Sequence, residues 1–156
     1  YAMKREYMKG IAEGERAVAL DPSGAYAHYC YALTLAWAGR SEEAIPIYQK
    51  TIRLNPFGTS AVYLDFGNAL RMVGRFEEAV SALKKAIQRS PNNILAHIYL
   101  AATYNMMDRE KEARAEAAEV LRVNPKFSLD SLPKMLPYKD QSVTDKIGNA
   151  LRKAGL

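Results

Sequence analysis

Four prolines spaced almost evenly along the chain restrict its fold more than any other feature. Pro22, Pro56, Pro91 and Pro125 are separated by 34, 35 and 34 residues. A period of this length indicates a solenoid, in which one supersecondary unit is repeated and stacked. The single extra residue falls in the loop between positions 56 and 60, where an insertion costs little free energy.

Other residue types recur in the same register, so the even spacing of the prolines is not a coincidence. Small, charged and apolar positions each return to the same place in three successive units. The aligned columns are Gly39/Gly74/Asp108, Arg40/Arg75/Arg109, Glu43/Glu78/Glu112, Ala44/Ala79/Ala113, Tyr31/Phe66/Leu100, Leu35/Leu70/Tyr104 and Ile52/Ile87/Leu121.

Each unit is predicted to be a pair of helices. The first helix ends at glycine or aspartate, residue types that tolerate the left-handed backbone closing a helix. The second stops before an X-Pro pair, because the residue before proline is pushed out of helical geometry. We expect Pro46 to cause a slight kink or a late start in its helix. The predicted first helices are 25–38, 60–73 and 94–107, and the predicted second helices are 41–54, 76–89 and 110–123.

This pattern of a 34-residue helix–turn–helix resembles the tetratricopeptide repeat (TPR). The matching repeats are 25–58, 60–93 and 94–125. The resemblance implies an all-α, right-handed helical solenoid of helix–turn–helix repeats with a C-terminal capping helix. The family often has Trp early in the first helix, whereas this chain has other rings there, and packing tolerates that change. The three residues of this column are His28, Tyr63 and His97.

The two ends depart from the repeat, and we interpret 1–156 as a single TPR domain with modified ends. Residues 3–20 match the second helix of a repeat only. Residues 126–156 form a predicted cap segment, which begins with a short helix over 127–135 that is ended by Pro133 and Pro137. An amphipathic helix over 142–153 follows, and a cap of this kind gives the terminal repeat a polar outer face.

The tail also resembles the segment that closes TPR regions in bacterial multidomain proteins with a class III adenylate/guanylate cyclase or a winged-helix domain. The matching stretches are Asn124–Ser128, Leu136–Asp140 and Ala150–Leu156. The resemblance implies a self-associating or regulatory region of a larger signalling protein, and the start at Tyr1 fits a piece of a longer chain. This sequence contains neither of those partner domains, so neither activity is assigned to it.

No catalytic or metal-binding pattern is recognisable in the sequence. It lacks the spacing of zinc-protease, phosphate-loop and nucleophile-elbow motifs. Cys30 is the only cysteine, and we expect it to be a partly buried, inert thiol. His28 and His97 share a repeat column, which favours packing over metal binding. We therefore expect a chain that is not an enzyme and needs no metal or other cofactor.

The charge pattern does not favour nucleic-acid binding. The net charge is +5, and residues 126–156 supply +3 of it, with six Lys/Arg against three Asp. A nucleic-acid-binding protein more often has a basic stripe along one face. No apolar run is long enough to cross a membrane, so we expect no membrane insertion. The expected location is cytoplasmic.

The resemblance to TPR proteins implies that the first helices line a concave face that binds an extended peptide or a helix. Aromatic and arginine side chains dominate many interfaces because they desolvate a large area at low entropic cost. The predicted protein-binding groove is Tyr26, Tyr29, Leu33, Trp37, Leu64, Asn68, Arg71, Met72, Leu95, Ile98, Asn105 and Met106, with Ala102, Tyr99 and Asp65 beside it.

Three occupants of this groove stay open at this point. They are a protein or peptide partner, a second copy of the chain, and the chain's own tail or missing upstream segment. The chaperone-binding subclass of the family holds a C-terminal carboxylate with Lys and Asn. Because those cations are missing here, we do not expect an EEVD-type tail to bind. The matching positions are Tyr29, Leu33, Asp65, Leu95 and Tyr99.

Overall fold

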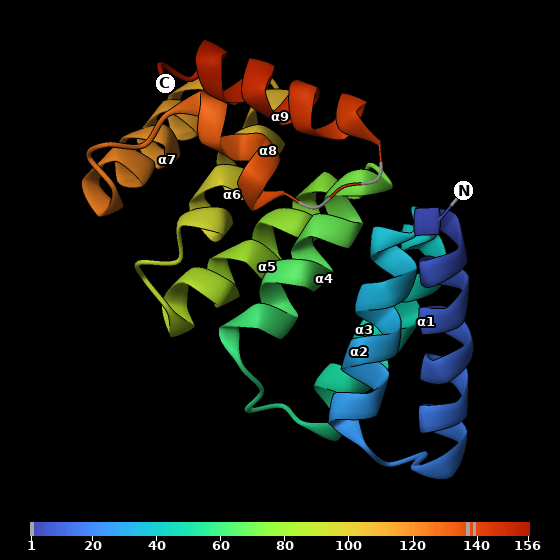
Figure 1. The fold of residues 1–156 in the computed structure, drawn as a ribbon. Helices are drawn as coiled ribbons and strands as arrows, with labels where there is room; N and C mark the ends of the chain where they lie inside the picture. The colour runs from blue at the N-terminus through green and yellow to red at the C-terminus, as the bar shows by residue number, and fades with distance from the viewer. Residues whose placement is uncertain (1, 137, 139) are drawn as a thin grey trace.

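The computed structural model describes residues 2–136, 138 and 140–156, and its side chains from residue 6 onward. Every regular element in this part of the chain is helical, and the helices stack in chain order (Figure 1). They are α1 (Ala2–Leu20), α2 (Ala25–Trp37), α3 (Ser41–Leu54), α4 (Ser60–Met72), α5 (Phe76–Arg89), α6 (Ile94–Met106), α7 (Glu110–Val123), the 3₁₀ turn η1 (Leu129–Ser131), α8 (Leu132–Met135) and α9 (Gln141–Lys153).

The helix bounds follow the repeat pattern closely. The second helices α3, α5 and α7 occupy the predicted residues, and the first helices α2, α4 and α6 each end one residue earlier than predicted. Gly39, Gly74 and Asp108 follow these ends with φ of 84°, 81° and 55°. A left-handed residue at this place closes the helix and turns the chain into its partner helix.

Neighbouring helices pack closely where a glycine faces a large side chain of the next helix. A Cβ atom on Gly67 of α4 would lie 2.7 Å from the Leu83 side chain of α5. A Cβ atom on Gly14 of α1 would lie 2.6 Å from the Tyr31 ring of α2. Helix α1 therefore packs against α2 as the second helix of a preceding repeat does.

The buried side chains form two clusters that meet at the α4–α5 hairpin. One cluster joins α1, α2 and α3 to Leu70 and Ala82. The other joins Leu64 and Leu83 to α6, α7, α8 and α9. The second repeat is thus shared between an N-terminal and a C-terminal half, which lie at opposite ends of the stack in Figure 1.

The tail differs from its prediction in its first helix. Pro133 does not end that helix but lies in the first turn of α8, where a missing N–H is tolerated. The expected stop at Pro137 lies outside the described residues. Helix α9 begins at Gln141, where the Asp140 side chain accepts a hydrogen bond from the Ser142 amide at 2.9 Å.

Pro46 lies inside α3, which starts at the predicted Ser41, so the helix does not start late. The other expected effect of Pro46, a slight kink, stays a prediction. No helix in the part of the chain that the structure describes is long and apolar enough to span a bilayer.

Candidate protein-binding face

The first helices α2, α4 and α6 expose several large apolar side chains among the residues predicted to line the groove. Tyr26 is 78% exposed and Met106 is 60% exposed, while Trp37 and Met72 are exposed by 41% and 38%. These four side chains form the part of the predicted groove that is open to solvent.

Tyr29 of α2 bridges to the second repeat through Asp65. Its hydroxyl donates to Asp65 Oδ2 at 2.7 Å. Burial raises the pKa of Asp65 from 3.8 to about 6, and the hydrogen bond from Tyr29 opposes part of that rise. The Tyr29 pKa is raised as well, first by burial and then by the nearby carboxylate. The polar pair at this place therefore carries a partly buried acidic group.

An aromatic series continues from this pair into the core. The Tyr29 ring lies 6.4 Å from both the Tyr26 and the Tyr48 rings, and Tyr48 lies 6.0 Å from Phe66. The Tyr48 hydroxyl is buried and has no hydrogen-bond partner among the described residues. The exposed Tyr26 thus sits on a rigid base of packed rings.

The tail reaches the middle of the predicted groove through Tyr138. The Tyr138 hydroxyl accepts from Asn68 Nδ2 at 2.7 Å and donates to the Tyr99 hydroxyl at 3.1 Å. Arg71 completes the cluster, since its Nη2 donates to Asn68 Oδ1 at 2.8 Å and its guanidinium lies 5.5 Å from the centre of the Tyr99 ring. The polar groups of α4 at this place are therefore already bound within the chain.

The C-terminal segment also covers much of α6. Ile98 is fully buried and Leu64 is 7% exposed, in one cluster with Leu132 and Leu136 of the tail. These two predicted groove residues support the face from below and do not reach its surface. The half-buried Leu95, Asn105 and Leu33 complete the predicted set; Leu33 lines a small cavity with Trp37, Met72 and Tyr138.

The two histidines are packing residues with defined hydrogen bonds. His28 is 2% exposed, and its Nδ1 lies 2.9 Å from the Gly24 carbonyl oxygen. His97 is 4% exposed, with Nδ1 2.6 Å from Glu116 Oε2 and Nε2 2.8 Å from the Pro91 carbonyl oxygen. Because both ring nitrogens of His97 face acceptors, the protonated ring fits best, and the Glu116 bond raises its pKa. The described residues contain no cluster of three metal-ligating side chains.

The repeat pattern did not predict the contact of Tyr138 with the groove. Tyr138 follows a proline in a segment without helical periodicity, so its place depends on the path of the tail and not on a pattern. The pairing of Tyr29 with Asp65 was partly foreseeable, because both lie on predicted first helices at neighbouring inner positions.

Comparison with known proteins gives the family. Two family models, both described as tetratricopeptide repeat, match residues 25–92 and 70–132 and together cover more than two thirds of the chain. The crystal structure of MamA superposes with a TM-score of 0.75 at 20% identity, covering 98% of this chain and 89% of MamA. The structure of YrrB, described as a TPR protein with an unusual peptide-binding site, has a TM-score of 0.70 at 20% identity and covers 98% and 78% of the two chains.

Among curated proteins, the chain is 48% identical over 44 residues to a putative adenylate cyclase 3 of Rhizobium meliloti (strain 1021), a match to 28% of this chain and 8% of that protein. This similarity supports the resemblance to cyclase-type multidomain proteins. The matches span a third or less of the length of the curated relatives. The stacked hairpins, the repeat columns and both family models agree that the chain belongs to the tetratricopeptide-repeat family.

Proposed function

We propose that this chain is a non-catalytic, cytoplasmic interaction module that binds a peptide or helix of a partner protein on the open part of its inner face. The observation that carries the proposal is the group of exposed apolar side chains on the first helices, namely Tyr26, Trp37, Met72 and Met106. YrrB has the same fold and is described as having a peptide-binding site, which supports a similar use here.

The binding surface we propose is smaller than the sequence alone indicates. Tyr138 forms hydrogen bonds with Asn68 and Tyr99, and the tail packs over the cluster that contains Ile98 of α6. These parts of the predicted groove are therefore already occupied by the chain itself. The exposed rings of α2, Met72 of α4 and the exposed Met106 of α6 remain for a partner. Such a surface favours a ligand with apolar anchors over one recognised by a charged clamp.

The test uses the full chain as bait, with Trp37→Ala as the diagnostic variant. Truncating a central aromatic anchor typically costs ~2 kcal/mol or more, which is about a 30-fold loss of affinity. The matched control is Leu121→Ala on α7, because Leu121 is 39% exposed and lies on a second helix. Wild type and Leu121→Ala should bind the same protein, identified by mass spectrometry, and Trp37→Ala should lose it while its circular dichroism is unchanged. Equal binding by all three proteins, or binding by none, contradicts the proposal.

A second candidate is a self-associating regulatory region of a larger signalling protein. The similarity to a putative adenylate cyclase favours it. Light scattering across the micromolar range separates the two candidates. A mass that doubles with concentration supports self-association, and a strict monomer contradicts it.

A further inference from the structure

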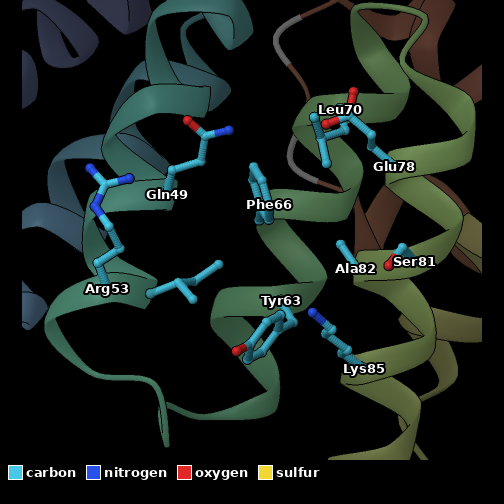
Figure 2. A pocket seen from close by; sticks show the side chains of 10 residues that line it. Gln49, Arg53, Tyr63, Phe66, Leu70, Glu78, Ser81, Ala82 and Lys85 are labelled. Carbon is cyan, nitrogen blue, oxygen red and sulfur yellow. The ribbon is translucent and has the colours of Figure 1, made fainter.

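A cavity of about 490 Å³ opens on the outer side of the stack, away from the proposed inner-face site, between the second helices of the first two repeats (Figure 2). Its walls are α3 and α5, and its floor is the Phe66 and Tyr63 rings of α4. Phe66 is half-buried and points into the gap between the two walls in Figure 2. An aromatic floor between two helix walls is the shape that takes an apolar side chain of another molecule.

The charged groups around this cavity are mostly basic. Arg53 extends from α3 and Lys85 from α5, both are exposed, and neither forms a salt bridge within the part of the chain that the structure describes. Glu78 is the one carboxylate of the lining, and Arg75 binds it with two hydrogen bonds of 2.8 and 2.6 Å. The acid is thus neutralised locally, and Arg53 and Lys85 set the sign of the potential.

Two basic side chains of α5 pack against the floor of the cavity, and one of them also binds the loop between the repeats. The Arg89 guanidinium lies 4.7 Å from the centre of the Tyr63 ring and donates to the Pro56 carbonyl oxygen at 3.0 Å and to that of Gly58. Lys85 Nζ lies 5.8 Å from the same ring. These contacts fix the floor and the loop between the repeats before any ligand arrives.

The next junction of the solenoid shows that this surface is particular to the first two repeats. One period on, the equivalents of Ala82 and Lys85 are Glu116 and Glu119. Glu116 Oε2 lies 2.6 Å from His97 Nδ1, and Glu119 Oε2 forms a salt bridge with Arg122 Nε at 2.7 Å. The second junction therefore carries acids and an internal bridge where the first carries a cation and a small side chain.

From these observations we infer that the α3–α5 cavity docks an acidic segment of a partner protein. An aromatic or aliphatic anchor enters the cavity over Phe66, and flanking carboxylates face Arg53 and Lys85. Complementary charge of this kind raises the association rate and selects against basic partners. The cavity is independent of the inner-face site, since Phe66, Arg53 and Lys85 all lie outside that face.

The experiment begins with selection of peptides from a random 12-residue display library on the full chain. Recovered peptides are synthesised and their affinity is measured by fluorescence anisotropy. One class should combine Asp or Glu with an aromatic or aliphatic anchor. Its binding should fall ~10-fold with Lys85→Glu at low salt, equivalent to about 1.4 kcal/mol, and the difference should shrink at 300 mM NaCl. Ser81→Trp, which fills the cavity from an exposed lining position, should abolish its binding.

Two control variants show whether the peptides bind in the cavity or elsewhere on the chain. Lys84→Glu makes the same charge change on an exposed neighbour that does not line the cavity, and it should have less than a third of the effect of Lys85→Glu. Trp37→Ala should leave these peptides bound, so failure of the inner-face proposal does not affect this result.

Several results overturn the inference. One is that none of the recovered acidic peptides loses binding to the Ser81→Trp variant. Another is that Lys84→Glu and Lys85→Glu lower peptide affinity equally. Competition by a single-stranded DNA 12-mer with the same dependence on Lys85 would point to nucleic acid instead. Self-association of the wild type that is lost in Lys85→Glu would point to a second copy of the chain.

Discussion

Asp65 provides the sharpest energetic prediction, because its carboxyl is buried where the neutral form is preferred. Its pKa rises from 3.8 to about 6, with burial as the first cause. A shift of this size corresponds to roughly 3 kcal/mol of penalty on the ionised folded state at neutral pH. Asp65→Asn removes that penalty, and an amide oxygen accepts the Tyr29 hydroxyl as the carboxylate does. The Asn side chain also brings N–H donors that the carboxylate lacks, and burying them without partners costs about 1 kcal/mol. We therefore expect the variant to be about 2 kcal/mol more stable at pH 7.5.

The sign of the pH dependence follows from linkage. An acid whose folded pKa lies above its unfolded value destabilises the folded state progressively as pH rises from about 4, and the penalty is complete above about 6. The gain from Asp65→Asn should therefore be largest at pH 7.5 and mostly absent at pH 4. For a chain of this length, 2 kcal/mol corresponds to a rise in Tm of about 4–8 °C.

The assay is thermal denaturation of wild type and variant, followed by circular dichroism from pH 4 to pH 8. Asp145→Asn is the matched control, because it makes the same chemical change at an exposed position of α9. It should shift Tm by no more than about 2 °C at every pH, because ordinary surface substitutions change stability by about 0.5 kcal/mol or less. An Asp65→Asn protein that is no more stable than wild type at pH 7.5, or whose gain does not change with pH, shows that burial does not penalise this carboxylate.

Two further predictions concern packing and protonation. Gly67→Ala should destabilise the protein by about 1–3 kcal/mol in urea denaturation, because its Cβ would lie 2.7 Å from the Leu83 side chain. Gly148→Ala is the control: its Cβ would have its nearest contact at 3.6 Å, so the variant should be about 0.5–1 kcal/mol more stable than wild type. The opposite order of stabilities contradicts the close packing of α4 on α5. Glu116→Gln should lower the His97 pKa measured by NMR titration, since the Glu116 bond is the first cause of its rise. The His97–Glu116 pair stabilises the folded state fully below the unfolded histidine pKa of about 6.5, and this stabilisation is lost as pH rises through the raised folded pKa. A wild-type protein whose stability does not fall over this pH range contradicts the prediction.

The repeat register could be predicted from the sequence because local rules fix it. Gly39, Gly74 and Asp108 adopt the left-handed backbone that their residue types suggest, so each first helix ends within one residue of its predicted end. The X-Pro pairs end the second helices for the same local reason. Pro133 shows the limit of such rules, since proline both ends a helix and fits its first turn.

The groove was less predictable because burial depends on what covers a face. Ile98 lies on an inner helix as expected, but Leu132 and Leu136 of the tail pack over its cluster and remove it from the surface. Tyr138 reaches Asn68 across 70 residues of sequence, and no periodic signal reports such a contact. The α3–α5 cavity likewise depends on the difference between Ala82 and its equivalent Glu116, which matters only once the helices are placed side by side.

Binding of a partner to the open inner face can be located residue by residue with a chemical-shift titration. The ¹⁵N-labelled chain is titrated with the partner recovered by the full-chain bait. We expect the largest shifts to fall on α2 and α4, with the Trp37 indole N–H and the amides around Tyr26 and Met72 among them. Shifts confined to α7 and α9, or none at saturating partner, would mean that this face is not the binding site.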